Sequence, residues 1–74
     1  MLTYTKILKK LTTEQVIDLA ADFMNILFFD LQLFGDKLYY KDFGMSDSWV
    51  VFTTEQEINF ASWVEDNSLQ YGIE

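Results

Sequence analysis

The chain of 74 residues contains neither cysteine nor histidine, and it has only three glycines and five basic residues. Without cysteine, no disulfide bond contributes to stability, and the redox state of the compartment cannot be inferred. The same absences remove the commonest metal ligands, the usual general base and the thiol nucleophile. Gly35, Gly44 and Gly72 are isolated, so no glycine-rich loop can hold a phosphate. We therefore predict that the protein is not an enzyme and holds no metal and no cofactor.

Positive charge is scarce and unevenly placed, with twelve acidic residues against five lysines and a net charge of −7. Three lysines lie before Leu11, so from that residue onward only Lys37 and Lys41 oppose all twelve carboxylates, which leaves −10. Such a surface repels nucleic acid and anionic membranes and attracts basic partners. We therefore expect a protein partner with a basic surface, no direct binding of nucleic acid and no contact with a membrane.

Long apolar runs are also lacking. Asp18, Asp22 and Asp30 interrupt the most apolar segment of the chain. The uninterrupted apolar stretches that remain are too short to span a membrane. No segment has the pattern of a signal peptide. We therefore expect a soluble protein of the cytoplasm, or of the host cytoplasm if a bacteriophage encodes it.

The length is that of one domain, and we expect residues 1–74 to form it. A domain of this size buries only about 60% of the surface that its unfolded chain exposes. Seven Phe, four Tyr and two Trp compensate for the small size, because each ring can bury on the order of 150–250 Å². This is more apolar surface than a small monomer usually hides, so we also expect a homo-oligomer.

The segment TTEQVIDLAADFMNILFFDLQLF, residues 12–34, predicts a long central helix. Thr12 and Gln15 have the spacing of a capping box, which marks the start of a helix. Apolar side chains then recur at helical spacing, at Val16, Ala20, Phe23, Leu27, Leu31 and Phe34. Gly35 follows as a natural C-terminal cap.

Two residues do not fit this helix, because Phe29 projects into its polar face and Asp30 falls in its apolar face. One explanation is that the helix ends near residue 28 and that residues 29–34 form a third strand. The sequence F-D-L-Q-L alternates with a period of two, and residues 35–36 allow a turn into the next strand. The other explanation is that the second half of the helix packs against another subunit, with Phe29 in the contact.

The remaining segments predict a short N-terminal helix, a hairpin and a second long helix. Residues 2–11 have helical spacing, with Thr3 or Thr5 as cap, and T-T-E-Q-E at residues 53–57 offers capping boxes that begin a helix. The tail, with Leu69, Tyr71 and Ile73, is either an edge strand or a frayed end. The predicted fold is α+β, in the order short helix, central helix (about 12–34), antiparallel hairpin (about 37–42 and 48–53) and C-terminal helix (about 54–67).

Lys37, Tyr39 and Lys41 share one face of the first hairpin strand. One interpretation is a platform on which bases stack while the lysines contact phosphates. The other is that the charges keep an edge strand from pairing with a foreign strand. We favour the second interpretation, because two lysines beside one tyrosine are weak against the surrounding negative charge.

Acidic side chains recur along both long helices. Glu14, Asp18 and Asp22 are four residues apart and project along one ridge, which does not converge on a metal ion. Carboxylates about 6 Å apart along a helix resemble a row of DNA phosphates. For any single acidic residue, a merely solubilising surface is the better explanation. The predicted partner-binding face consists of Glu14, Asp18, Asp22, Glu55, Glu65 and Asp66.

In size and charge, although in no motif, the chain resembles the small acidic inhibitors that bacteriophages direct against host nucleases and defence systems. We therefore predict a small acidic protein-binding module. It would inhibit a host nucleic-acid-binding or defence protein through its anionic helical face, with mimicry of DNA as one means. The alternative is a homo-oligomeric structural or accessory protein that uses the apolar face of the central helix. In that case the self-association residues are Phe28, Phe29 and Leu33.

Overall fold

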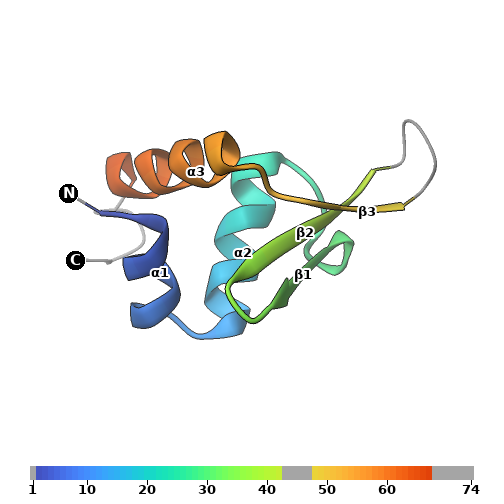
Figure 1. Cartoon of the computed structure of the whole chain (residues 1–74), viewed down its shortest axis with the longest axis horizontal. Coiled ribbons are helices and arrows are strands. Elements are labelled where there is room, and N and C mark those ends of the chain that lie inside the picture. The colour runs from blue at the N-terminus through green and yellow to red at the C-terminus, as the bar shows by residue number, and fades with distance from the viewer. Residues whose placement is uncertain (1, 43–47, 68–74) are drawn as a thin grey trace.

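In the part of the chain that the structure describes, each of the three α-helices begins directly after a threonine. A computed structural model describes residues 2–42 and 48–67 of the chain (Figure 1). The helices are α1 (Tyr4–Lys10), α2 (Thr13–Met24) and α3 (Thr54–Asp66). The hydroxyl oxygens of their N-caps, Thr3, Thr12 and Thr53, each accept a hydrogen bond from a backbone N–H of the first turn. The predicted starts of all three helices are confirmed, including complete capping boxes at α2 and α3.

The prediction of a central helix over residues 12–34 is wrong, because α2 ends at Met24. Asn25 adopts the left-handed conformation, with φ of 58°, and its backbone N–H donates to the carbonyls at the end of the helix. A short 3-10 helix, η1 (Phe28–Asp30), and a strand, β1 (Leu31–Phe34), follow. The alternative of a third strand is confirmed, but its bounds are not: the helix ends at residue 24 and not near residue 28, and the strand begins at residue 31 and not at residue 29.

Pairing with the next strand explains why the chain leaves the helix. β1 pairs in antiparallel fashion with β2 (Lys37–Asp42), and β2 pairs with β3 (Ser48–Val51). Leu33 lies opposite Leu38 across the first pair, so the period-two pattern places both on one face of the sheet. Gly35, with φ of 59°, allows the tight turn between β1 and β2.

The predicted hairpin of β2 and β3 is confirmed, with β3 ending at Val51 rather than at residue 53. Its connecting loop, residues 43–47, lies outside the described residues, as do Leu69, Tyr71 and Ile73 of the predicted tail. α3 matches the predicted C-terminal helix to within one residue at its end. The fold is α+β, with a three-stranded antiparallel sheet in the order β1-β2-β3.

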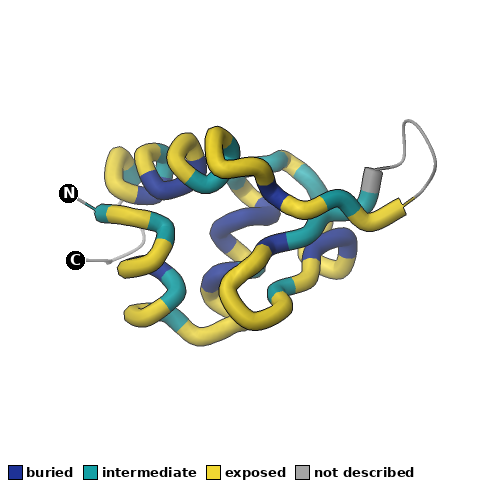
Figure 2. Tube along the Cα trace, viewed as in Figure 1, coloured by how far each residue is buried: buried dark blue, intermediate teal, exposed yellow. Residues whose placement is uncertain are grey.

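Phe60, on α3, lies at the centre of the core and is fully buried. Its ring centroid is 5.4 Å from that of Phe23, 6.3 Å from that of Phe52 and 6.5 Å from that of Tyr4. These contacts join α3 to α2, to the residue that follows β3 and to α1. Buried residues lie on the sides of the helices and strands that face one another, as the dark blue segments in Figure 2 show.

Replacement of Phe60 tests this central role. We expect Phe60→Leu to lower the free energy of unfolding by about 1–3 kcal/mol, because it removes ring contacts with three other elements. Ile58→Ala is the control on the same helix; Ile58 is 62% exposed, so its truncation should change stability by no more than about 0.5 kcal/mol. Urea titration followed by circular dichroism measures both. Equal losses for the two variants would contradict the placement of the core.

A second pair of variants tests the cap at Asn25. Asn25→Ala should lower the free energy of unfolding by about 1 kcal/mol, because alanine is more strained than asparagine in the left-handed region. Asn25→Gly should leave stability unchanged or slightly raised, because glycine adopts this conformation freely. Urea titration gives both values. If alanine and glycine behave alike at this position, the left-handed cap does not determine where α2 ends.

Candidate functional site

Large apolar side chains are exposed where α2 gives way to β1. In the described part of the chain, Leu27, Phe28 and Phe29 are 59%, 61% and 63% exposed, respectively. The rings of Phe28 and Phe29 contact each other edge to face, with centroids 5.5 Å apart. Isolated exposed apolar residues are normal on a protein surface, but three consecutive ones are unusual. This segment is therefore the first place to look for a binding site.

An open groove lies between this segment and α2, with a volume of about 340 Å³. We call it the α2–η1 groove. It is lined by Glu14, Ile17, Asp18, Phe28, Phe29 and Leu31. The end of α2 at Met24 creates it, because the chain turns there and η1 comes back alongside the helix.

Two of the residues that line the groove are acidic. Glu14 and Asp18 are both exposed and lie one helical turn apart on α2. The sequence placed these two residues on a partner-binding face, and it placed Phe28 and Phe29 on a separate self-association face. The structure brings all four to the same groove. The groove therefore combines apolar side chains, which we call its apolar floor, with two carboxylates, which we call its acidic edge.

The other predicted acidic residues lie elsewhere. Asp22 is exposed one turn further along α2 and does not line the groove. Glu55 is in the first turn of α3, whereas Glu65 and Asp66 are in its last turn, roughly 15 Å away along the helix axis. The six carboxylates therefore do not form one continuous row.

The remaining groove residues were not predicted as site residues. Ile17 and Leu31 belong to the apolar pattern of residues 12–34, which periodicity assigns to the core. Leu31 is indeed buried, and Ile17 is half-buried. Leu33, which was predicted for self-association, is half-buried against the core. No signal in the sequence distinguishes a core residue that also lines a groove from a core residue that does not.

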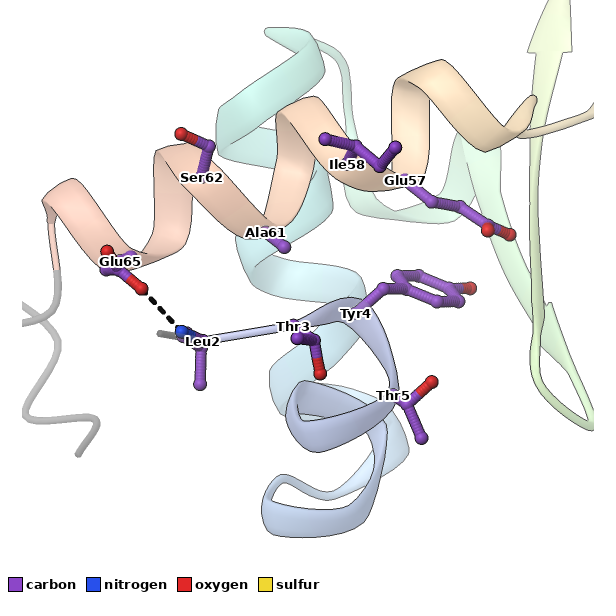
Figure 3. Close-up of a pocket in the computed structure, with 9 residues that line it drawn as sticks. All are labelled: Leu2, Thr3, Tyr4, Thr5, Glu57, Ile58, Ala61, Ser62 and Glu65. Carbon is purple, nitrogen blue, oxygen red and sulfur yellow. Dashed lines mark hydrogen bonds between the residues drawn. The ribbon is translucent and has the colours of Figure 1, made fainter.

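A second hollow, of about 420 Å³, lies between α1 and α3 (Figure 3). The side chain of Glu57 runs beside the ring of Tyr4, and Glu65 accepts a hydrogen bond from the backbone N–H of Leu2. The Tyr4 hydroxyl donates to the carbonyl oxygen of Asp36 at 2.9 Å. One carboxylate oxygen of Glu57 lies 3.8 Å from Nζ of Lys37. These polar groups hold α1 and α3 to the turn between β1 and β2.

Burial and the nearby Glu57 carboxylate raise the pKa of Tyr4 from its ordinary value of 10.0 to about 12. The hydroxyl therefore stays protonated and remains a hydrogen-bond donor. A protonated phenol whose proton is directed at a backbone carbonyl is neither a nucleophile nor a general base. The hollow is thus explained by structural contacts, and the α2–η1 groove remains the stronger candidate.

Comparison of the chain with protein-family models, with curated proteins and with solved structures finds no match. Within the described residues, no three acidic side chains are close enough together to hold a metal ion. No helix over those residues is long and apolar enough to span a bilayer. The candidate site is therefore defined by the geometry of the α2–η1 groove.

The raised pKa of Tyr4 predicts a dependence of stability on pH. The unfolded chain releases this proton near its ordinary pKa of 10.0, whereas the folded chain retains it up to about 12. Its contribution to stability is therefore complete below about pH 10 and is lost as pH rises toward about 12. Phenylalanine has no proton to release, so Tyr4→Phe should lose less of its free energy of unfolding at high pH than the wild type does. The difference in this free energy between the two proteins should therefore change between about pH 8 and about pH 11. Urea titrations at both pH values provide the test, and a constant difference would contradict it.

Proposed function

We propose that this protein is a small acidic protein-binding module whose α2–η1 groove receives a basic segment of a partner protein. One observation carries the proposal: Phe28 and Phe29 are exposed in the same groove as the carboxylates of Glu14 and Asp18. An apolar floor with an acidic edge suits a segment that has an apolar anchor and neighbouring lysine or arginine residues.

The apolar floor supplies the affinity. Aromatic side chains dominate the energetics of protein interfaces when a partner excludes water from them. A groove of about 340 Å³ holds one or two side chains of a partner. Since Phe28 and Phe29 are more than half exposed, a partner that covers them removes a large apolar area from water.

The acidic edge determines which partners the groove prefers. Glu14 and Asp18 belong to the part of the chain that carries a charge of −10. Such a field accelerates the approach of basic proteins and disfavours acidic ones. A nucleic-acid-binding or defence protein of a host is the partner class that we propose, because such proteins present basic surfaces, and occupation of that surface would inhibit them.

Mimicry of DNA by a row of carboxylates has less support. Such a row needs acidic groups at regular intervals over one surface, whereas the predicted ones lie on α2 and at opposite ends of α3. An aromatic anchor with two carboxylates at its edge is a different mode of binding. We therefore propose anchoring at the groove, assisted by charge.

Self-association through the groove also has less support. In a symmetric dimer the same patch meets itself, so the two α2–η1 grooves would bring Glu14 and Asp18 of one copy toward those of the other. Like charges that face each other across an interface are unfavourable. The groove therefore favours a basic partner over a second copy.

Affinity capture with matched variants tests the proposal. Photo-crosslinking from position 29 in host cell extract, read by mass spectrometry, identifies the protein seated in the groove. With that partner purified, Phe28→Ala or Phe29→Ala should weaken binding by roughly 30-fold or more. The double variant Glu14→Lys/Asp18→Lys should weaken it by at least about tenfold, and added salt should weaken wild-type binding.

The double variant Glu55→Lys/Asp66→Lys is the control, because it makes the same change of charge on α3, away from the groove. It should retain binding apart from the small effect of net charge. If all charge variants weaken binding equally, the partner responds to overall charge and not to the groove. If the crosslinked partner is acidic, or if Phe28→Ala and Phe29→Ala bind like the wild type, the proposal is wrong.

A further inference from the structure

The face of the sheet that points away from the helices also carries exposed apolar residues. Alternation along the strands separates it from the inner face, where Leu31 and Leu38 are buried. We call it the outer sheet face. Phe34, Trp49 and Val51 on this face are 64%, 40% and 39% exposed. Its residues in the described strands are Gln32, Phe34, Lys37, Tyr39, Lys41, Trp49 and Val51.

Three aromatic rings cross the outer sheet face on a diagonal. Phe34 lies opposite Lys37, so Tyr39 on β2 is its diagonal neighbour. Tyr39 lies opposite Val51, so Trp49 on β3 is the next residue on the same diagonal. Diagonal neighbours in a sheet are roughly 7–8 Å apart, and the rings of Phe34 and Tyr39 have centroids 5.9 Å apart. The diagonal therefore forms a ridge of aromatic rings from β1 to β3.

The charge of this face differs from that of the rest of the molecule. The outward-facing strand residues that the structure describes include no carboxylate, although the whole chain carries −7. Nζ of Lys41 lies over the ring of Trp49, 5.9 Å from its centroid. Lys37 is within 3.8 Å of the Glu57 carboxylate on α3. The outer sheet face is thus apolar and weakly positive, in contrast to the acidic α2–η1 groove.

We propose that the outer sheet face is the contact between two copies of this chain, packed sheet against sheet. Two sheets that pack face to face lie about 10 Å apart, with their side chains interdigitated. A twofold axis in the plane of the contact, passing near Tyr39 and perpendicular to the diagonal, sets Phe34 of one copy against Trp49 of the other. Each aromatic ridge then lies along the other in the reverse direction, as a symmetric contact requires.

Charge selects a second copy over other occupants. The described strand residues of this face offer a basic partner no carboxylate, and a nucleic acid would be repelled by the charge of −7. Two copies of an acidic chain repel each other least where neither presents a carboxylate. This is a property of the outer sheet face and not of the α2–η1 groove, so the dimer leaves the groove open to a different partner.

The area of the outer sheet face determines how tightly we expect two copies to bind each other. Three strands of about four residues cover less than the roughly 800 Å² per partner of a standard interface. The expected dimer is therefore weak, with a dissociation constant on the order of 100 µM. Sedimentation velocity from about 20 µM to about 1 mM spans this range and should show the average mass rising toward about twice that of the monomer.

Three lysine substitutions locate the contact. Phe34→Lys and Trp49→Lys should each hold the chain as a monomer up to the highest concentration, because a charge would be buried in the contact. Phe29→Lys is the matched control, since Phe29 is 63% exposed and lies in the groove. It should dimerise like the wild type. Circular dichroism and thermal unfolding confirm that each variant is folded before it is compared.

A mixing experiment tests the orientation. Phe34→Lys and Trp49→Glu should each be monomeric alone, but an equimolar mixture should dimerise, because the twofold arrangement sets the two introduced charges against each other. The proposal is overturned if the wild type stays monomeric throughout, if Phe29→Lys abolishes the dimer while Phe34→Lys does not, or if the mixture stays monomeric. It is also overturned if labelled oligothymidylate binds the wild type and Trp49→Ala abolishes that binding, since the face would then serve nucleic acid.

Discussion

The left-handed conformation of Asn25 is the constraint on which the rest of the structure depends. If α2 continued past this residue, Leu27, Leu31 and Phe34 would extend the apolar stripe of one helix. Because the backbone turns at Asn25, residues 27–29 leave the helix and Leu31 enters a strand. Asparagine tolerates this conformation better than other residues with a β-carbon. The turn at Asn25 ends α2, and the pairing of β1 with β2 holds residues 31–34 in the sheet.

The same turn produces both apolar surfaces of the molecule. It brings Phe28 and Phe29 alongside the acidic side of α2, which makes the α2–η1 groove. It also supplies β1, whose Phe34 begins the aromatic ridge of the outer sheet face. The groove has carboxylates at its edge, whereas the described strand residues of the outer sheet face contribute none. Two surfaces that are alike in apolar character therefore differ in charge, and we propose a basic partner for one and another copy of the chain for the other.

The predictions that succeeded depend on interactions within a few residues. The capping box of Thr12 and Gln15 closes within a single turn, and the hairpin of β2 and β3 follows from alternation and residue type. The predictions that failed needed knowledge of distant neighbours. The apolar residues from Val16 to Phe34 do recur at helical spacing in the sequence. The chain nevertheless pairs Leu33 with Leu38 in a sheet, because pairing with a neighbouring strand outweighs the local periodicity.

The acidic surplus, the starts of the helices and the α+β class were determined by the sequence alone, because charge, capping and alternation are properties of single residues or of close neighbours. The tertiary structure decided where α2 ends, which of its apolar residues stay exposed, and that Glu14 and Asp18 share a groove with Phe28 and Phe29. It also decided that Phe34, Tyr39 and Trp49 fall on one diagonal. Exposure and proximity depend on what packs across the chain, and a pattern along the chain does not contain that information.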